Sequence, residues 1–193
     1  MKKHILTAAL MVLVMTVMTG LAYPLVITAI SKLVFPAESE GSAISVDGGI
    51  IGSGLIGQEF KGPRYFWSRP SMTGDKPYNS AASGGSNLGP MNPKLRENAM
   101  DRIRALKTAD PGNSLEIPIG LVTSSASGLD PHISPDAALY QVRRVAGARG
   151  LNEGIVEELV MKSIEPRTLG ILGEPRVNVL KLNIALDRLS GLH

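Results

Sequence analysis

The chain has 193 residues, with 20 lysines and arginines, 17 aspartates and glutamates, a formal net charge of +3 and no cysteine. The lack of cysteine excludes disulfides, thiolate nucleophiles, zinc ribbons and iron–sulfur clusters. Lys2, Lys3 and Lys32 all precede the first acidic residue, Glu38, and removing them leaves 17 basic groups against 17 acidic ones. We therefore expect no nucleic-acid partner, because counterion release requires a clustered basic face.

The first predicted element is a membrane anchor over residues 5–34. No charged residue occurs from Ile5 to Ser31, and about 20 apolar residues suffice to cross a bilayer core. A cleaved signal peptide has a shorter apolar region and a small-x-small cleavage site, and a buried core helix has a polar face, so a retained anchor is favoured. The lysines before the helix place residues 1–4 in the cytoplasm, the helix in the lipid bilayer and the chain from Phe35 onward on the other side, periplasmic or extracellular.

Two features of this helix predict a packing site for a second membrane helix and an irregularity in the backbone. Thr16 and Gly20 stand four positions apart and form a small-xxx-small pair, which allows another membrane helix to approach closely. Pro24 has no N–H group, so it removes one backbone hydrogen bond and predicts a kink.

Residues 35–50, rich in Pro, Glu, Ser and Gly, are predicted to form a linker, and residues 51–193 an extracytoplasmic globular domain. The domain begins with a glycine-punctuated strand and turn at residues 50–57. The letters from Gly52 to Gly57 fit a dinucleotide-binding fingerprint, but Gly62-Pro63 ends any following helix too early for that site.

The next segment is unusually aromatic. Five of the chain's eight aromatic residues lie within 19 positions, interleaved with basic side chains. One interpretation is a corner of the core, with arginines stacked against the rings. The other is a subunit interface, since Trp, Tyr and Arg dominate interface hot spots. The candidate interface residues are Tyr65, Phe66, Trp67 and Arg69.

The remaining pattern predicts an α+β domain with a small sheet and about four helices. After a loop at residues 83–93, Asn92-Pro93 begins a helix over 94–107, with one buried face formed by Leu95, Ala99, Ile103 and Leu106. Residues 115–125 are predicted to form a strand in which Pro118 marks an edge or the start. Further helices are expected from Pro135 to about Arg149, from Asn152 to about Ser163 and from about Asn178 to Leu189, with a turn at 168–175.

Asp130, His132 and Ser134 lie within five residues and invite a catalytic interpretation. A triad requires convergence across the fold, however, and side chains two positions apart on a loop rarely converge. A turn at Asp130 and a helix cap at Ser134 explain two of the three residues without catalysis. The chain also lacks zincin, α/β-hydrolase and penicillin-binding signatures, so we expect no catalytic residue and no metal site.

Six blocks in order along the chain resemble the C subunits of the Kdp potassium-transporting ATPase, a bacterial high-affinity potassium pump. They are Gly52–Phe60, Tyr65–Ser71, Ser83–Pro93, Gly128–Pro135, Gln141–Leu151 and Leu172–Asn183. Tyr23-Pro24 in the anchor is also similar to the family pattern. The resemblance therefore covers nearly the whole chain.

The resemblance implies a non-catalytic accessory subunit, single-pass in the cell inner membrane, of a P-type ATPase complex. The implied partners are a potassium-translocating subunit, a P-type ATPase subunit and a small membrane peptide. The implied role is to support assembly and to raise the ATP affinity of the catalytic subunit, as a catalytic chaperone. No cofactor is assigned to the chain itself, and ATP is expected only through the partner ATPase subunit. A membrane-tethered exported enzyme or solute-binding domain stays open as the alternative.

Overall fold

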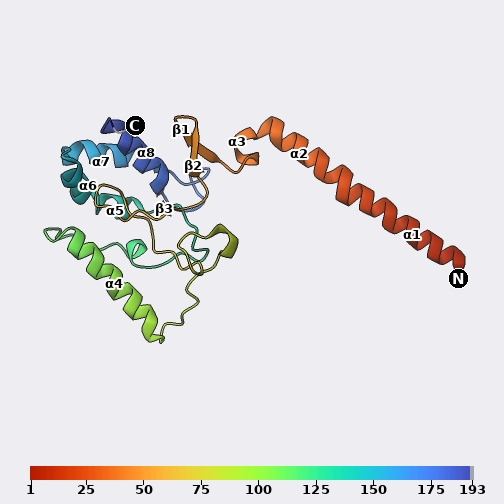
Figure 1. Ribbon diagram of the computed structural model, residues 1–193, viewed down its shortest axis with the longest axis horizontal. Helices are drawn as coiled ribbons and strands as arrows, with labels where there is room; N and C mark the ends of the chain where they lie inside the picture. The colour runs from red at the N-terminus through yellow and green to blue at the C-terminus, as the bar shows by residue number, and fades with distance from the viewer. Residues whose placement is uncertain (192–193) are drawn as a thin grey trace. The chain divides into compact units, whose positions relative to one another are not determined.

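The computed structural model describes residues 1–191, and the chain divides into two compact units, Met1–Ile50 and Ile51–His193 (Figure 1). The first unit is mostly one long helix, and the second combines helices with a small antiparallel sheet. This mixture confirms the predicted α+β class.

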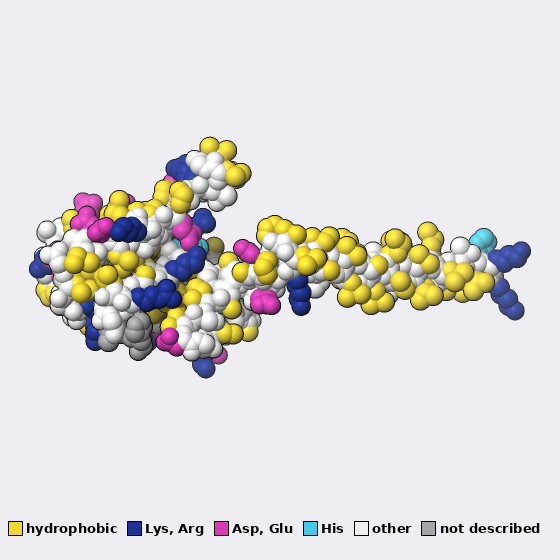
Figure 2. All heavy atoms as spheres, turned by 90° about the horizontal axis from the view of Figure 1, so that it is seen from above, with side chains coloured by type: hydrophobic (Ala, Val, Ile, Leu, Met, Phe, Trp, Pro, Cys, Tyr) yellow, Lys and Arg dark blue, Asp and Glu magenta, His cyan; other side chains and the backbone are white. Residues whose placement is uncertain are grey.

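In the first unit, α1 (Lys2–Val17), a π-helical turn η1 (Met18–Ala22) and α2 (Tyr23–Val34) follow one another without interruption. The resulting helix has 33 residues and a mean hydropathy of 2.3 over its most apolar window, none of which is buried. Hydrophobic side chains surround it along its length, and basic side chains lie at its N-terminal end (Figure 2). By length and composition, this helix is a candidate membrane span.

The irregularity expected near Pro24 takes the form of the π turn. The N–H of Tyr23 donates to the carbonyl of Met18, five residues earlier. Because Pro24 has no N–H, the carbonyl of Gly20 lacks the donor that a regular α-helix would supply. The wider π turn accommodates this missing bond, and such turns occur frequently at functional sites.

The expected linker, residues 35–50, contains regular structure. A short helix α3 (Pro36–Ser39) precedes the strands β1 (Ala43–Val46) and β2 (Gly49–Ser53), which form a two-stranded sheet. Asp47 and Gly48 join the strands with φ values of +51° and +80°. Two positive φ angles in a two-residue connection match the strand twist, and Asp-Gly is among the sequences that favour this turn.

The second unit has a three-stranded antiparallel sheet in the order β3 (His132–Ile133), β5 (Arg176–Asn178), β4 (Ile164–Glu165). Ile133 and Ile164 both pair with Val177 of the central strand. Because side chains alternate along a strand, these three residues share one face of the sheet. His132, Glu165 and Arg176 therefore share the other face.

Helices complete the second unit. They are η2 (Ser80–Ala82), α4 (Pro93–Ala109), η3 (Ile119–Leu121), α5 (Pro135–Leu139), α6 (Val142–Arg149), α7 (Glu153–Lys162) and α8 (Val179–Leu189). The caps predicted at Asn92, Ser134 and Asn152 are present, since each side chain accepts a backbone N–H in the first turn of a helix. Asn178 caps α8 in the same way.

The helix predicted from Pro135 to Arg149 is interrupted at Gln141. The backbone N–H of Gln141 donates to Ala138, whereas its side-chain amide donates to the carbonyl of Ala137. In a continuous α-helix the backbone N–H of Gln141 would donate to the Ala137 carbonyl, but here the Gln141 side chain donates to it instead. The stretch becomes α5 and α6, and Gly150, with φ +68°, ends α6.

Two further sequence predictions are wrong. Residues 115–125 form no strand, because after Pro118 the chain closes the short turn η3, in which the N–H of Leu121 donates to Pro118. The predicted buried face of α4 is covered only toward its C-terminal end, where Leu106 is 2% exposed, whereas Leu95 is 37% exposed.

Candidate functional site

Phe66 and Trp67 are buried in a stretch that forms neither helix nor strand, and two buried side-chain amides bind their backbone. Asn183 of α8 accepts from the Phe66 N–H at 2.9 Å and donates to the Phe66 carbonyl at 3.0 Å. Gln141 accepts from the Trp67 N–H at 2.7 Å and donates to the Trp67 carbonyl at 3.2 Å. These amides supply the bonds that a neighbouring strand would otherwise make.

Two arginines stack on Trp67. The guanidinium carbons of Arg144 and Arg102 lie 4.5 Å and 5.1 Å from the centre of the indole ring. Arg144 also donates to the carbonyls of Pro63 and Tyr65, at 2.7 Å and 3.0 Å. Burial lowers the pKa of Arg144 to about 10, so the guanidinium remains charged at neutral pH and holds the ring by cation–π attraction.

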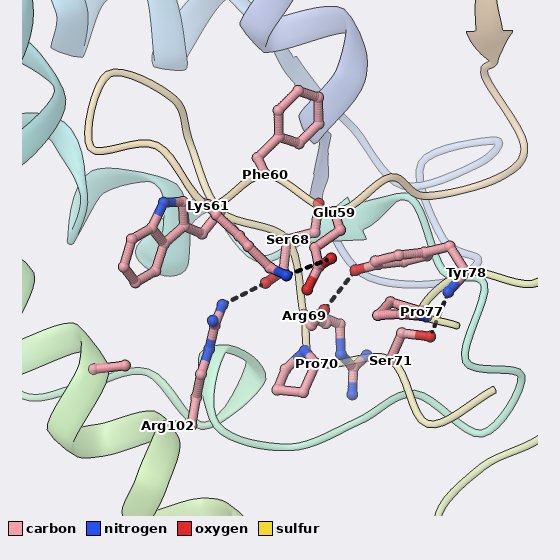
Figure 3. Close-up of a pocket in the computed structure, with 12 residues that line it drawn as sticks. Glu59, Phe60, Lys61, Ser68, Arg69, Pro70, Ser71, Pro77, Tyr78 and Arg102 are labelled. Atoms are coloured by element: carbon pink, nitrogen blue, oxygen red, sulfur yellow. Dashed lines mark hydrogen bonds and ion pairs between the residues drawn. The ribbon is translucent and has the colours of Figure 1, made fainter. Parts of the chain in front are cut away.

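A pocket of about 330 Å³ lies beside this stack (Figure 3). Arg102 of α4 crosses it to donate to the Ser68 carbonyl at 2.9 Å, and Tyr78 donates to the Arg69 carbonyl. Burial raises the pKa of the Tyr78 hydroxyl despite the opposing hydrogen bond from Ser68, which keeps it protonated as a donor. Because these polar groups bind backbone carbonyls, they hold the shape of the pocket.

A second group of charged side chains surrounds His132 on the polar face of the sheet. The His132 Nδ1 lies 3.3 Å from Asp130, whose other oxygen pairs with Arg69 at 3.1 Å. The His132 Nε2 lies 3.7 Å from Glu165. Glu165 in turn pairs with Arg176 at 3.3 Å and with Lys181 at 3.1 Å. We call Arg69, Asp130, His132, Glu165, Arg176 and Lys181 the His132 cluster.

The structure brings Asp130 and His132 together but assembles no triad. The Ser134 hydroxyl accepts from the Ala137 N–H at 3.2 Å and caps α5, and the second nitrogen of His132 faces the Glu165 carboxylate instead of a hydroxyl. Within residues 1–191, no group of three or more histidines and carboxylates could hold a metal ion. The cluster is therefore arranged as an ion-pair network, and it joins the 130–132 loop to β4, β5 and α8.

The two carboxyl groups of the cluster are held in their charged form. For Asp130, burial alone would raise the pKa, but hydrogen bonds from His132 and the charge of Arg69 outweigh it and lower the pKa below 3.8. For Glu165, burial is likewise outweighed by the hydrogen bond and charge of Lys181, with smaller contributions from His132 and Arg176, and the pKa lies below 4.5.

These pKa shifts predict that acid weakens the folded domain. A carboxyl group whose pKa is lower in the folded state adds stability above its unfolded pKa and loses it as the pH falls through the folded value. We expect Asp130→Asn to cost about 1–2 kcal/mol of unfolding free energy at pH 7. That difference should shrink as the pH falls through the lowered pKa of the Asp130 carboxyl in the folded state, and it should disappear once both states bind the proton.

Thermal unfolding of the detergent-solubilised protein and of Asp130→Asn, at pH 7 and pH 3, measures this effect. Asp75→Asn is the matched control, since Asp75 is exposed. A melting difference for Asp130→Asn that persists unchanged at pH 3 would contradict the role assigned to the charge.

The structure places the predicted interface residues at different depths. Phe66 is 0% and Trp67 8% exposed, which fits the core interpretation for these two side chains. Tyr65 is half-buried beneath Arg149, whose guanidinium lies 4.8 Å from its ring centre, and Arg69 is half-buried in the His132 cluster. A partner contact at this segment stays a prediction and would have to use the half-buried side chains.

Thr16 and Gly20 are both exposed on the first-unit helix, Thr16 two residues before the π turn and Gly20 within it. A Cβ atom added to Gly20 would lie 3.9 Å from the Thr16 methyl group, so the two positions are adjacent on one face. Packing of a second helix against this face stays a prediction.

Sequence reasoning missed Asn183, Gln141 and Glu165, each of which contacts another segment of the chain. A signal was available for Asn183, because it is a polar residue between Leu182 and Leu186 on an apolar helix face. A buried polar residue in such a position needs a hydrogen-bonding partner. The identity of that partner, 117 positions earlier, could not be read from the pattern.

Comparison with known proteins gives a consistent result. Residues 5–188 match the family described as "KdpC: K+-transporting ATPase, c chain". A relative from Polaromonas naphthalenivorans, named "Potassium-transporting ATPase KdpC subunit", is 56% identical over 192 residues, covering 99% of this chain and 98% of its own. Proteins of the same name from Methylococcus capsulatus and Herpetosiphon aurantiacus are 54% and 57% identical, covering 98% and 94% of this chain and 100% and 94% of their own.

Proposed function

Because the chain belongs to the family of c chains of K+-transporting ATPases, we propose that it is a non-catalytic accessory subunit of such a pump. It supports assembly of the complex and raises the ATP affinity of the catalytic subunit. Its proposed partners are a potassium-translocating subunit, a P-type ATPase subunit and a small membrane peptide.

The observation that carries this proposal is the extent of the family match. It covers residues 5–188 and thus includes both the apolar helix and the folded domain. The interior of the domain agrees with an accessory role, since the polar groups around Trp67 and His132 are engaged with backbone carbonyls or with one another.

We further propose that residues 1–4 lie in the cytoplasm and that the domain lies outside it. The proposal rests on Lys2 and Lys3 before the helix and on Glu38 and Glu40 after it, together with positive-inside bias. In this topology the domain does not contact ATP directly. It acts on ATP affinity through the translocating subunit, by holding one of its conformations or by covering the potassium entrance.

The test is co-purification from potassium-starved cells that carry a C-terminally tagged chain. Membranes are solubilised in mild detergent, and the subunits retained on the tag are identified and quantified. We expect a P-type ATPase subunit and a polytopic potassium-translocating subunit in fixed ratio. The KM for ATP of that complex should rise when the tagged chain is removed.

Recovery of the intact, membrane-bound chain alone would overturn the accessory role. That result would favour the alternative of a tethered enzyme or solute-binding domain. The pocket of about 400 Å³ that His132 and Asp130 line would then be the place to search for a ligand.

A further inference from the structure

The loop between β4 and β5 ends in an exposed apolar tip. Leu169, Ile171 and Leu172 are 84%, 74% and 56% exposed. Three large aliphatic side chains in four consecutive positions form a contiguous patch, and such patches on soluble domains mark interaction sites. We call residues 168–172 the apolar tip.

The apolar tip is a closed, hydrogen-bonded turn. Thr168 and Leu172 exchange two backbone hydrogen bonds of 2.9 Å, and the N–H of Ile171 donates to Thr168 at 3.3 Å. Below the turn, Arg167 pairs with Glu174 at 2.6 Å. The three apolar side chains are therefore presented by an ordered backbone, which lowers the entropy lost when a partner binds.

Leu169 has a left-handed backbone conformation that is unfavourable for leucine. Leu169 and Gly170 have φ values of +55° and +76°, and two central residues with positive φ favour Asn, Asp or Gly. A left-handed conformation costs a residue with a Cβ about 1–2 kcal/mol. Burial does not offset this cost, because Leu169 is 84% exposed. The unfavourable residue is explained if its side chain is buried against a partner.

The base of this loop is fixed by the His132 cluster. Glu165 ends β4 and Arg176 begins β5, and the two pair across the sheet at 3.3 Å. His132 of β3, on the opposite side of β5 from β4, lies 3.7 Å from Glu165. The ion-pair network thus holds both ends of the loop that carries the apolar tip.

Charge distinguishes between a protein and a bilayer as the occupant. Membrane-inserting segments gain attraction to anionic lipid from unpaired lysines and arginines. Beside the apolar tip, Arg167 is neutralised by Glu174, and the nearest apolar residues include no Trp or Tyr. A convex aliphatic tip with a neutral base fits an apolar hollow in a protein surface.

We propose that the apolar tip is the docking element by which the domain binds an apolar hollow on a membrane-embedded subunit of the same pump, outside the bilayer. This inference rests on the proposed function, since it requires the pump subunits as partners. Beyond the proposed function, this inference names the apolar tip as the contacting surface of this chain and an apolar hollow as the matching surface of the partner subunit.

Leu169→Asn separates docking from folding. Asparagine suits the turn better than leucine, so the thermal stability of the variant should be equal or higher. Loss of a hot-spot side chain, worth about 2 kcal/mol, should weaken the affinity of the full-length chain for the detergent-solubilised pump lacking this subunit by about 30-fold. Leu169→Met should bind nearly as well as the wild type. Leu115→Asn, at another leucine that is 62% exposed, is the matched control and should bind normally.

Photo-crosslinking identifies the occupant directly. Benzoylphenylalanine placed at position 169 of the full chain should form an adduct with a pump subunit when illuminated in membranes. Adducts with lipid alone, or with a second copy of the chain, would overturn the proposal. An affinity of Leu169→Asn for the pump within twofold of the wild-type affinity would also overturn the proposal, although the accessory function would then stand. Failure of the wild type to bind would instead overturn the proposed function.

Discussion

Replacing Asn183 with leucine is expected to lower the free energy of unfolding by about 2–6 kcal/mol. The two side chains are similar in size, so little packing is lost. The change, however, leaves the N–H and the carbonyl of Phe66 buried without partners. Each such group costs about 1–3 kcal/mol, and domains of this size are stable by only about 5–15 kcal/mol.

Denaturant unfolding of the full chain in mild detergent measures this loss, with the chain's single tryptophan, Trp67, as the fluorescent probe. Trp67 is 8% exposed in the folded domain, so its emission should shift when the core opens. Asn98→Leu in α4 makes the same exchange at an exposed helical position and should change stability by less than about 0.5 kcal/mol. Equal effects of the two variants would show that the amide bonds to Phe66 contribute little.

The features that sequence reasoning predicted correctly depend on neighbouring residues. The caps at Asn92 and Asn152 each accept from an N–H group two positions further on, so a short pattern suffices to place the start of each helix. The apolar run before Lys32 likewise needs only its own length to be identified as a candidate span.

The features it missed depend on contacts between distant segments. The strands β3 and β4 have two residues each, too few for an alternating pattern to be recognised. The pairing of Glu165 with His132 follows from the register of β5 between them, which only the assembled sheet defines. The interruption at Gln141 arises because its side chain serves Trp67, 74 positions earlier.

Replacing Phe66 with alanine is expected to cost about 3–5 kcal/mol of unfolding free energy. The ring is 0% exposed and belongs to the main apolar cluster of the second unit. Its removal loses the transfer free energy of the ring and leaves a cavity that the surrounding backbone, held by Asn183 and Gln141, cannot readily fill. Unfolding followed by Trp67 fluorescence should therefore shift strongly in the isolated chain.

The same variant distinguishes the two interpretations of the aromatic segment. If the segment serves the core, Phe66→Ala destabilises the isolated chain, and less complex is recovered because less chain is folded. If it serves mainly as an interface, the isolated chain unfolds normally while binding to the pump is lost. Phe60→Ala is the matched control, since Phe60 packs only partly buried against the same cluster and its removal should cost less. Normal unfolding of Phe66→Ala, combined with weakened binding, would show that the core interpretation is wrong despite the depth of the ring.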